Sequence, residues 1–402
     1  MISFEEALAI VDKKTAMVNA ELKTAVVPLS RAAGFVLAED LTADRDYPPF
    51  DRATRDGFAV RAADLAEGAA TLHIVGEIPA GGHFRKALGA GECARIMTGA
   101  AVPEGADAVV MLEEANDSSS EVTINRSVAP FDNVVRRGSE AREGSRVLAR
   151  GKRVGAGEIA LLAATGKDAV PVFEKLAVAI LATGDELAPV EAQPGEYQIR
   201  NSNSAMLASC VERAGGIPRV LGVARDEKPI LRAKITEGLE APLLVLSGGV
   251  SMGAYDLVKS VLTDLGAEFY FHGVAMRPGK PVLFGRARDT LLFGLPGNPV
   301  SAFVTFELFV LPAIGVLGGA PFERAVYFRA RLGSPARHKP GLTAFLPARV
   351  GWEGGLPVVY PVLWQGSGDL VALAAANCFV VAGENQSELA AGDWVNVLTE
   401  RT

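Results

Sequence analysis

Three apolar stretches in the middle of this chain each end in a loop of small, polar or acidic residues, and this repetition constrains the fold most. They are LAVAILATGDEL (residues 176–187), PLLVLSGGVSMGAYD (residues 242–256) and TLLFGLPGNPVSA (residues 290–302). Helical patterns separate them, as in parallel sheets, whose ligands bind outside the carboxyl ends of the strands. We therefore predict that the three loops meet at one edge of a sheet.

The rest of the chain divides around this α/β region, because 402 residues exceed one ordinary domain. Helical patterns at the N-terminus, one of them capped by Ser3 with Glu6 and a shorter one at residues 30–38, precede a run of short strands and turns. The expected domains are a discontinuous N-terminal α/β domain, an inserted β domain, the α/β domain and a small C-terminal β domain or barrel, at residues 1–44 with 136–172, 45–135, 173–322 and 323–402.

Charge and composition exclude several classes of protein. The net charge of -7, from 40 basic and 47 acidic residues, gives no electrostatic footprint for nucleic acid. The three cysteines form no CxxC pair, which argues against a disulfide framework or a thiolate zinc site. The N-terminus lacks a signal-peptide pattern, and the apolar residues 302–317 are interrupted by Glu307 and Pro312. We expect a cytoplasmic protein without a membrane span.

The loop that follows the second apolar stretch is rich in glycine and serine. Glycines let a backbone approach a ligand closely, and free amides at a helix start attract anions. A plain helix-entry turn is the competing interpretation, but two other loops of similar composition are predicted at the same edge of the sheet. The substrate-binding candidates here and at the end of the first stretch are Thr183, Gly184, Ser247, Gly248, Gly249, Ser251 and Gly253.

Four acids are predicted beside this loop, namely Asp185, Glu186, Asp226 and Asp256. Each could simply cap a helix or complement its dipole. Together, however, they would repel an anionic ligand unless a divalent cation bridged them. Oxygen ligands from carboxylates and phosphates suit Mg²⁺. The sequence therefore predicts a phosphorylated ligand held with magnesium.

Two further turns belong to the same predicted edge. MRPGKP places the cations Arg277 and Lys280 around a tight turn, which could also be a solvated surface turn. The third apolar stretch ends in a proline-rich loop that restricts the backbone and exposes amides, with candidates Pro296, Gly297, Asn298 and Ser301. No GxxxxGK[ST] motif occurs, which disfavours a kinase or an ordinary nucleotide triphosphatase.

With these residues in view, the chain resembles the molybdopterin molybdotransferases, the molybdenum-insertase family that includes the C-terminal domain of gephyrin. The shared motifs are RDGFAV, RIMTGAAVP, ATGDEL, IRNSNS, LSGGVSMGAYD, RPGKP and LPGNPVSA, in family order over most of the chain. The resemblance implies an elongated homodimer. It also implies a three-layer molybdopterin-binding domain with an inserted β domain, a discontinuous N-terminal domain and a C-terminal β-barrel.

The family's reaction inserts molybdate into adenylylated molybdopterin and releases AMP with Mg²⁺. Motif by motif, the resemblance implies the catalytic residues Asp56, Thr98, Glu186, Asp226 and Asp256, of which the last three also hold the metal. Asp56 and Thr98 would face the cleft of the other subunit. Molybdate would be held by Arg277, Lys280, Ser367 and Arg349, although Leu342 and Pro347 stand near Arg349 where relatives often carry arginines. The NSNS stretch, residues 201–204, is either a substrate contact or a helix N-cap, and Asn201 is the site candidate taken from it.

Two other functions compete with insertion. A molybdopterin adenylyltransferase shares the α/β core but usually lacks the flanking β domains and the RDGFA and MTGA segments. A non-catalytic scaffold of the same fold would have no need of acids facing a cleft. The resemblance also implies protein partners, namely the adenylyltransferase and the enzymes that receive the cofactor.

Overall fold

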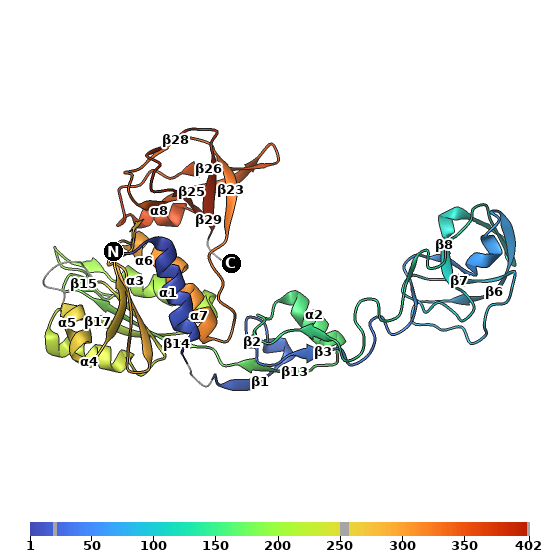
Figure 1. Cartoon of the computed structure of the whole chain (residues 1–402), viewed down its shortest axis with the longest axis horizontal. Coiled ribbons are helices and arrows are strands. Elements are labelled where there is room, and N and C mark those ends of the chain that lie inside the picture. The colour runs from blue at the N-terminus through green and yellow to red at the C-terminus, as the bar shows by residue number, and fades with distance from the viewer. Residues whose placement is uncertain (19–21, 250–256, 400–402) are drawn as a thin grey trace.

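The largest domain of the computed structural model, which describes residues 1–18, 22–249 and 257–399, contains a six-stranded sheet (Figure 1). The first four strands in sheet order pair in parallel, and a hairpin, as predicted, supplies the last of these and its antiparallel neighbour. The strands are apolar along their length because helices bury both faces of the sheet. In sheet order they are β17 (Ile217–Ala224), β14 (Ala177–Thr183), β18 (Leu243–Ser247), β22 (Thr290–Leu295), β21 (Leu283–Ala287) and β19 (Glu268–His272).

Helices on both faces give this domain the expected three layers. Alternate residues of each strand serve the two faces, so that Ile180 packs into one core and Leu181 into the other. The first face is covered by α3 and by the long helix Pro299–Leu317, and the second by α4 and α5. The bounds are α3 (Ser202–Arg213), α4 (Lys228–Gly238) and α5 (Leu257–Asp264).

The N-terminal helix α1 (Phe4–Ala16) also belongs to this core, which corrects the placement of residues 1–44 in one unit with residues 136–172. Its capping box forms as predicted, with Glu6 N–H donating to Ser3 Oγ at 3.2 Å. Its apolar side chains Leu8 and Val11, however, pack with residues of the long helix and the sheet. Periodicity identifies the buried face of a helix but not the partner that buries it.

The long apolar helix consists of α6 (Pro299–Thr305), the π-helical segment η4 (Phe306–Val310) and α7 (Leu311–Leu317). By length and composition this helix could cross a membrane, yet 83% of its most apolar 18-residue stretch is buried inside the protein. Its one acidic residue, Glu307, is buried and forms an ion pair with Arg213 of α3. It is therefore a core helix of the α/β domain.

A smaller unit lies between the α/β domain and the inserted β unit (Figure 1). It combines a three-stranded sheet, a helix and a two-stranded ladder from two separate parts of the chain. The helix expected over residues 30–38 is wrong: only one short 3-10 turn forms, and β2 then pairs with β13. The elements are β1 (Thr24–Pro28), η1 (Leu29–Arg31), β2 (Val36–Leu37), β3 (Leu41–Thr42), β12 (Arg146–Leu148), α2 (Ala156–Ala164) and β13 (Ala169–Phe173).

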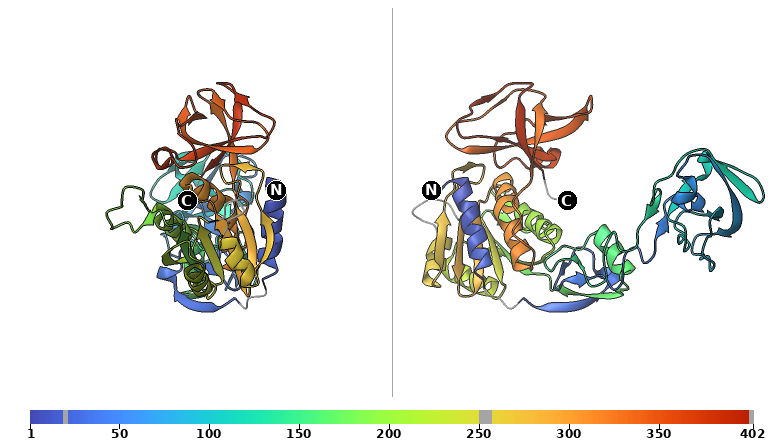
Figure 2. Two further views of the ribbon diagram at one scale, coloured as in Figure 1. Left: turned by 90° about the vertical axis from the view of Figure 1, so that its left-hand side faces the viewer. Right: turned by 45° about the vertical axis from the view of Figure 1, so that its right-hand side comes forward.

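The inserted β unit lies at the far end of the molecule from the six-stranded α/β sheet (Figures 1 and 2). Two chain crossings join it to the smaller unit, and it has apolar cores of its own around Phe58 and Ile96. Its strands, in sheet order, are β8 (Ala108–Met111), β5 (Gly57–Val60), β7 (Glu92–Ile96), β6 (Ala70–Ile78), β10 (Glu121–Ile124) and β9 (Ala115–Asp117). The chain is therefore elongated.

A closed β-barrel follows the long helix, which confirms the expected C-terminal domain. The ring closes because the eleven-residue strand β25 pairs with both β26 and β27. The short strand β20 (Met276–Arg277) of the α/β domain pairs with β25 and brings the barrel beside that domain. The barrel strands are β23 (Tyr327–Leu332), β25 (Thr343–Glu353), β26 (Leu356–Pro361), β27 (Cys378–Ala382) and β29 (Trp394–Thr399).

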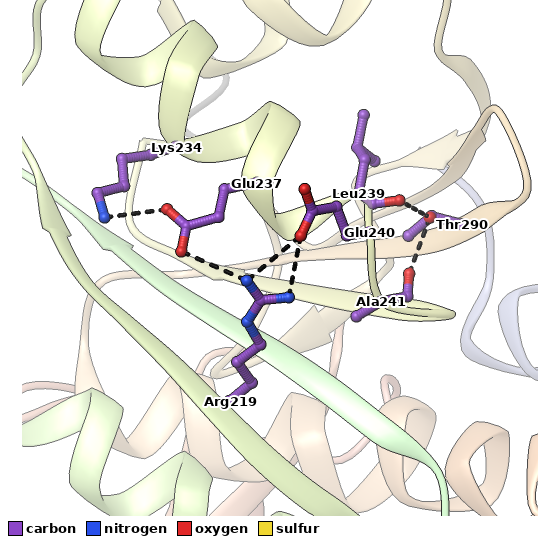
Figure 3. A network of polar contacts seen from close by, with 7 residues as sticks. All are labelled: Arg219, Lys234, Glu237, Leu239, Glu240, Ala241 and Thr290. Carbon is purple, nitrogen blue, oxygen red and sulfur yellow. Dashed lines mark hydrogen bonds and ion pairs between the residues drawn. The ribbon is translucent and has the colours of Figure 1, made fainter.

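Polar contacts close the amino-terminal edge of the parallel strands (Figure 3). The buried hydroxyl of Thr290, at the start of β22, lies 2.8 Å from the carbonyl oxygens of Leu239 and Ala241 and donates to them. Arg219 forms ion pairs with Glu237 at 3.6 Å and Glu240 at 3.3 Å. The polar groups at this edge contact one another. The carboxyl ends of the strands are therefore the edge at which a ligand could bind.

Candidate functional site

The carboxyl ends of β14, β18 and β22 open on a pocket of about 850 Å³, as the sequence predicts. Its walls come from the loops after β14, β17, β18 and β22, from the start of α3, and from Gly368 and Leu370 of the C-terminal part of the chain. We call it the sheet-edge pocket. The sequence-predicted residues that line it are Thr183, Gly184, Glu186, Asn201, Asp226, Ser247, Gly248, Gly249, Pro296, Gly297 and Asn298.

Two glycines shape the loop after β18, and no other residue would fit there. Gly248 and Gly249 have φ values of 91° and 65°, in the left-handed region that favours glycine. A Cβ atom on Gly248 would lie 2.5 Å from the carbonyl oxygen of Thr183, and one on Gly249 would lie 2.6 Å from Thr183 Oγ1. The backbone of this loop is thus packed directly on the end of β14, where its amides can approach a ligand.

Two carboxylates line the sheet-edge pocket from neighbouring loops, Glu186 after β14 and Asp226 after β17. Asp185 does not line it; its Oδ1 accepts a hydrogen bond from Asp226 N–H at 3.2 Å and so supports that loop. Within the described ranges, no three His, Cys, Asp or Glu side chains gather closely enough to hold a metal. The predicted residues Ser251, Gly253 and Asp256 lie outside the described residues.

The donor set of this pocket nevertheless fits magnesium. Its ionisable ligands are the oxygens of Glu186 and Asp226, with neither histidine nor cysteine among the lining residues. Mg²⁺ binds through one or two carboxylates together with substrate phosphates and water. The three cysteines are buried, and burial raises the pKa of Cys93 and Cys378 to about 12. Thiolate ligands are therefore not offered there.

Two asparagines at the start of α3 have different roles. Asn201 is the N-cap, since its Oδ1 accepts from Ser204 N–H at 3.1 Å, although it also lines the pocket. Asn203, which the sequence analysis included in the NSNS stretch but did not single out, donates to Ser247 Oγ at 2.9 Å and to the carbonyl oxygen of Gly297 at 2.7 Å. The signal was present in the NSNS stretch, but only the fold shows which of its polar residues faces the loops.

A second pocket of about 680 Å³ adjoins the first and contains the predicted cations. We call it the cationic pocket. Arg277, Lys280, Ser301 and Ser367 all line it. Pro296 and Asn298 line both pockets, and Gly297 between them lines the sheet-edge pocket; we call residues 296–298 the shared wall. Asn298 in this wall donates to Ser367 Oγ at 2.8 Å, which ties the wall to the loop that precedes α8 (Leu370–Ala375).

Arg349 is not in either pocket, which contradicts its predicted contact with molybdate. It lies on β25, and its guanidinium donates to the carbonyl oxygen of Ala375 at 3.2 Å. Leu342, from the same segment, does line the cationic pocket. The motif match therefore does not bring Arg349 to the other predicted molybdate residues, because the order of residues in a motif does not determine which surface each side chain faces.

Asp56 and Thr98 form a pair in the inserted β unit, which lies at the far end of the molecule from the α/β domain of the same chain (Figure 1). Asp56 Oδ1 accepts from the Thr98 N–H at 2.6 Å and from the Thr98 hydroxyl at 2.8 Å. These two bonds, the backbone one first, lower the pKa of Asp56 from its ordinary value. The pair presents an ionised carboxylate at the surface, but one chain does not bring it to the other predicted residues.

Similarity to known proteins covers nearly the whole chain. Residues 2–166 match the MoeA N-terminal region (domain I and II), residues 179–315 a probable molybdopterin binding domain, and residues 329–399 the MoeA C-terminal region (domain IV). A curated molybdopterin molybdenumtransferase of Bacillus subtilis (strain 168) is 39% identical over 375 residues, 91% of this chain and 87% of that protein. One of Staphylococcus epidermidis (strain ATCC 12228) is 34% identical over 403 residues, 99% and 95% of the two chains.

A solved structure agrees with these sequence matches. The molybdopterin biosynthesis MoeA protein of Pyrococcus horikoshii OT3 superposes with a TM-score of 0.81 at 30% identity, and the match covers 100% of both chains. The agreement extends over the flanking β units as well as the α/β domain, since all four parts fall within the matched length.

Proposed function

Since the chain belongs to the molybdopterin molybdenumtransferase (MoeA) family, a family of transferases, we propose that it inserts molybdate into adenylylated molybdopterin and releases AMP. The observation that carries this proposal is the shared wall. An amide-rich, acid-lined pocket and a cationic pocket meet at residues 296–298, so a phosphate with Mg²⁺ and a metal oxyanion could be held side by side.

In the sheet-edge pocket, the glycine-rich loop would bind phosphate through its backbone amides. Glu186 and Asp226, with Asp256 from outside the described residues, would hold Mg²⁺. When bound, this ion would neutralise phosphate charge and polarise the phosphoanhydride for attack by water. The substrate-binding set proposed here also includes Thr183, Gly184, Ser251, Gly253, Asn201 and the residues of the shared wall.

In the cationic pocket, Arg277, Lys280 and Ser367 would bind molybdate. A guanidinium, an ammonium and a hydroxyl are donors that match the oxygens of a tetrahedral dianion. Ser301 lines the same pocket and lies in the first turn of the core helix, so we place this substrate-binding candidate on the cationic side of the wall. Arg349 is not included, because it lies outside the pocket.

The catalytic pair Asp56 and Thr98 would act in a homodimer. Their place at the far end of the elongated chain supports contribution in trans, to the cleft of a second copy (Figure 1). We also propose a cytoplasmic location and, as protein partners, the adenylyltransferase and the enzymes that accept the finished cofactor. The division of the chain is proposed at residues 45–135 for the insertion and 323–402 for the barrel, with helix α1 assigned to the α/β domain.

The test is a single turnover assay. Purified protein is incubated with adenylylated molybdopterin and Mg²⁺, with and without molybdate, and AMP is measured by chromatography. Molybdate-dependent AMP release, lost when Mg²⁺ is chelated, is the expected result. Formation of adenylylated molybdopterin from molybdopterin and ATP would instead indicate the adenylyltransferase reaction. If the protein catalyses neither reaction, it is a non-catalytic scaffold. Either of these last two outcomes overturns the proposal.

A further inference from the structure

Asn203 uses both protons of its side-chain amide to hold two loops of the sheet-edge pocket. Its Nδ2 atom donates to Ser247 Oγ at 2.9 Å and to the carbonyl oxygen of Gly297 at 2.7 Å. Ser247 ends β18, and Gly297 belongs to the shared wall. One buried amide on α3 therefore ties the phosphate-type loop to the wall of the neighbouring pocket.

The direction of these hydrogen bonds can be deduced from the chemistry of the groups. A carbonyl oxygen can only accept, so Gly297 fixes Nδ2, and not Oδ1, on this side of the amide. Ser247 Oγ must then accept from Nδ2, which leaves its own proton to donate elsewhere. Because Ser247 lines the pocket, that proton is available to an anionic ligand.

The same arrangement recurs across the wall. Asn298 Nδ2 donates to Ser367 Oγ at 2.8 Å in the cationic pocket, which leaves the Ser367 proton to donate in turn. Each pocket thus has one serine whose hydroxyl is made a donor by an asparagine amide. Oxyanions, which accept hydrogen bonds and cannot donate them when ionised, are the ligands that both serines suit.

The other side of the Asn203 amide shows the cost of holding these two loops. Its Oδ1 atom is buried and has no hydrogen-bond partner in the part of the chain described. An unpartnered buried oxygen destabilises a fold. An aliphatic residue would avoid that cost but would lose both donated hydrogen bonds, so the amide keeps these two loop contacts at the expense of its own oxygen.

We propose that Asn203 is a positioning residue, which makes the Ser247 hydroxyl a hydrogen-bond donor to the substrate phosphate and holds the shared wall through Gly297. This inference rests on the proposed function for the identity of the phosphate. It adds a residue that sequence reasoning had not assigned to the site.

The test separates binding from stability. Asn203→Ala is expected to raise KM for adenylylated molybdopterin by about tenfold, while kcat stays within about twofold of wild type. Ser247→Ala is expected to have a similar effect, and the double variant to be no worse than either single one, because both changes remove the same donor. A purely structural role would instead reduce the active fraction, and so kcat, at unchanged KM.

Asn377→Ala is the matched control. This asparagine also makes two hydrogen bonds, accepting from Val350 N–H at 2.8 Å and donating to the carbonyl oxygen of Val350 at 3.1 Å, but it lines neither of the two pockets. Its loss is expected to leave KM unchanged. An unchanged KM in Asn203→Ala, or additive effects in the double variant, would overturn the inference.

A second measurement does not depend on turnover. Calorimetry with inorganic pyrophosphate and Mg²⁺ is expected to give weaker binding to Asn203→Ala than to wild type. Asn203→Asp keeps the side-chain size but replaces the donor with an acceptor, so that Ser247 would donate to the new carboxylate, and binding is expected to fall further. Equal affinities would overturn the inference, whereas a wild-type protein that binds pyrophosphate but releases no AMP would overturn only the proposed function.

Discussion

Among single residues, Thr98 determines the charge state of Asp56 most directly. Its N–H and its hydroxyl both donate to the Asp56 carboxylate, and together they lower the pKa of that group. Thr98→Val keeps the N–H and removes the hydroxyl, so the pKa of Asp56 should rise toward its ordinary value. If ionised Asp56 is needed for AMP release, activity should be lost at a higher pH as the solution is acidified.

The measurement is the pH dependence of kcat/KM for AMP release. The acid limb of the profile should move to higher pH in Thr98→Val, and the plateau at higher pH should stay close to wild type. Thr71→Val is the control, since Thr71 shares a 3.0 Å hydrogen bond with Thr123 in the same β unit, away from Asp56. An acid limb that does not move would show that Asp56 does not titrate in catalysis.

Motif and residue type predicted many residues of the candidate site, but not where each side chain points in the fold. Gly248 and Gly249 were identified because a tight loop between a strand and a helix needs residues without a Cβ. Asn203 was not singled out because Asn201, two positions earlier, satisfies the same helix-start pattern. Arg349 lies outside both pockets, because a motif gives the order of residues along the chain and not the surface that each side chain faces.

At the level of elements, the two ends of the parallel sheet have separate tasks. The carboxyl ends carry the pockets, whereas the amino end is closed by Thr290, whose buried hydroxyl donates to the carbonyl oxygens of Leu239 and Ala241 (Figure 3). Thr290→Val keeps the shape but leaves those carbonyls unpaired on that side. We expect a loss of about 1–3 kcal/mol in the free energy of unfolding, with KM for adenylylated molybdopterin unchanged.

Urea denaturation of wild type and variant, followed by kinetics on the folded protein, measures both quantities. Thr263→Val is a useful control, because its hydroxyl donates to the carbonyl oxygen of Lys259 within the exposed surface of a helix and little stability should depend on it. A raised KM in Thr290→Val would mean that the two ends of the sheet are mechanically coupled.

Element type was more predictable than element partner. The alternation of apolar runs with helical patterns predicted a single α/β domain with a parallel sheet, and the hairpin β21–β22 formed as expected. Helix α1 was also found from its spacing and its capping box. The packing of this helix on the α/β core was not predicted, because Leu8 and Val11 could be buried equally well against any apolar surface. Such tertiary choices depend on contacts far apart in sequence, which local patterns do not encode.

At the scale of the whole molecule, the elongated shape separates Asp56 from the two pockets of its own chain. Asp56 directly precedes β5 of the inserted unit, which lies at the opposite end of an elongated body from the α/β domain that carries Glu186 (Figure 1). A symmetric dimer can place the inserted unit of each copy at the sheet-edge pocket of the other. Each active site would then combine Asp56 from one subunit with Glu186 from its partner, and two different defects could be separated between sites.

This arrangement predicts complementation between inactive subunits. Asp56→Asn and Glu186→Gln keep the size of each side chain, and each homodimer should be inactive because both of its sites carry one defect. A heterodimer of the two variants has one site with both defects and one intact site, so it should show about half of the wild-type activity.

Tandem purification through two different affinity tags isolates the heterodimer for this measurement. If each site were built from a single chain, every site in the heterodimer would carry one defect, and no activity would return. Failure to recover any doubly tagged protein would exclude the dimer itself. Recovered activity would place the reaction between two copies of the chain, which explains why an elongated molecule keeps a catalytic carboxylate so far from its own substrate pocket.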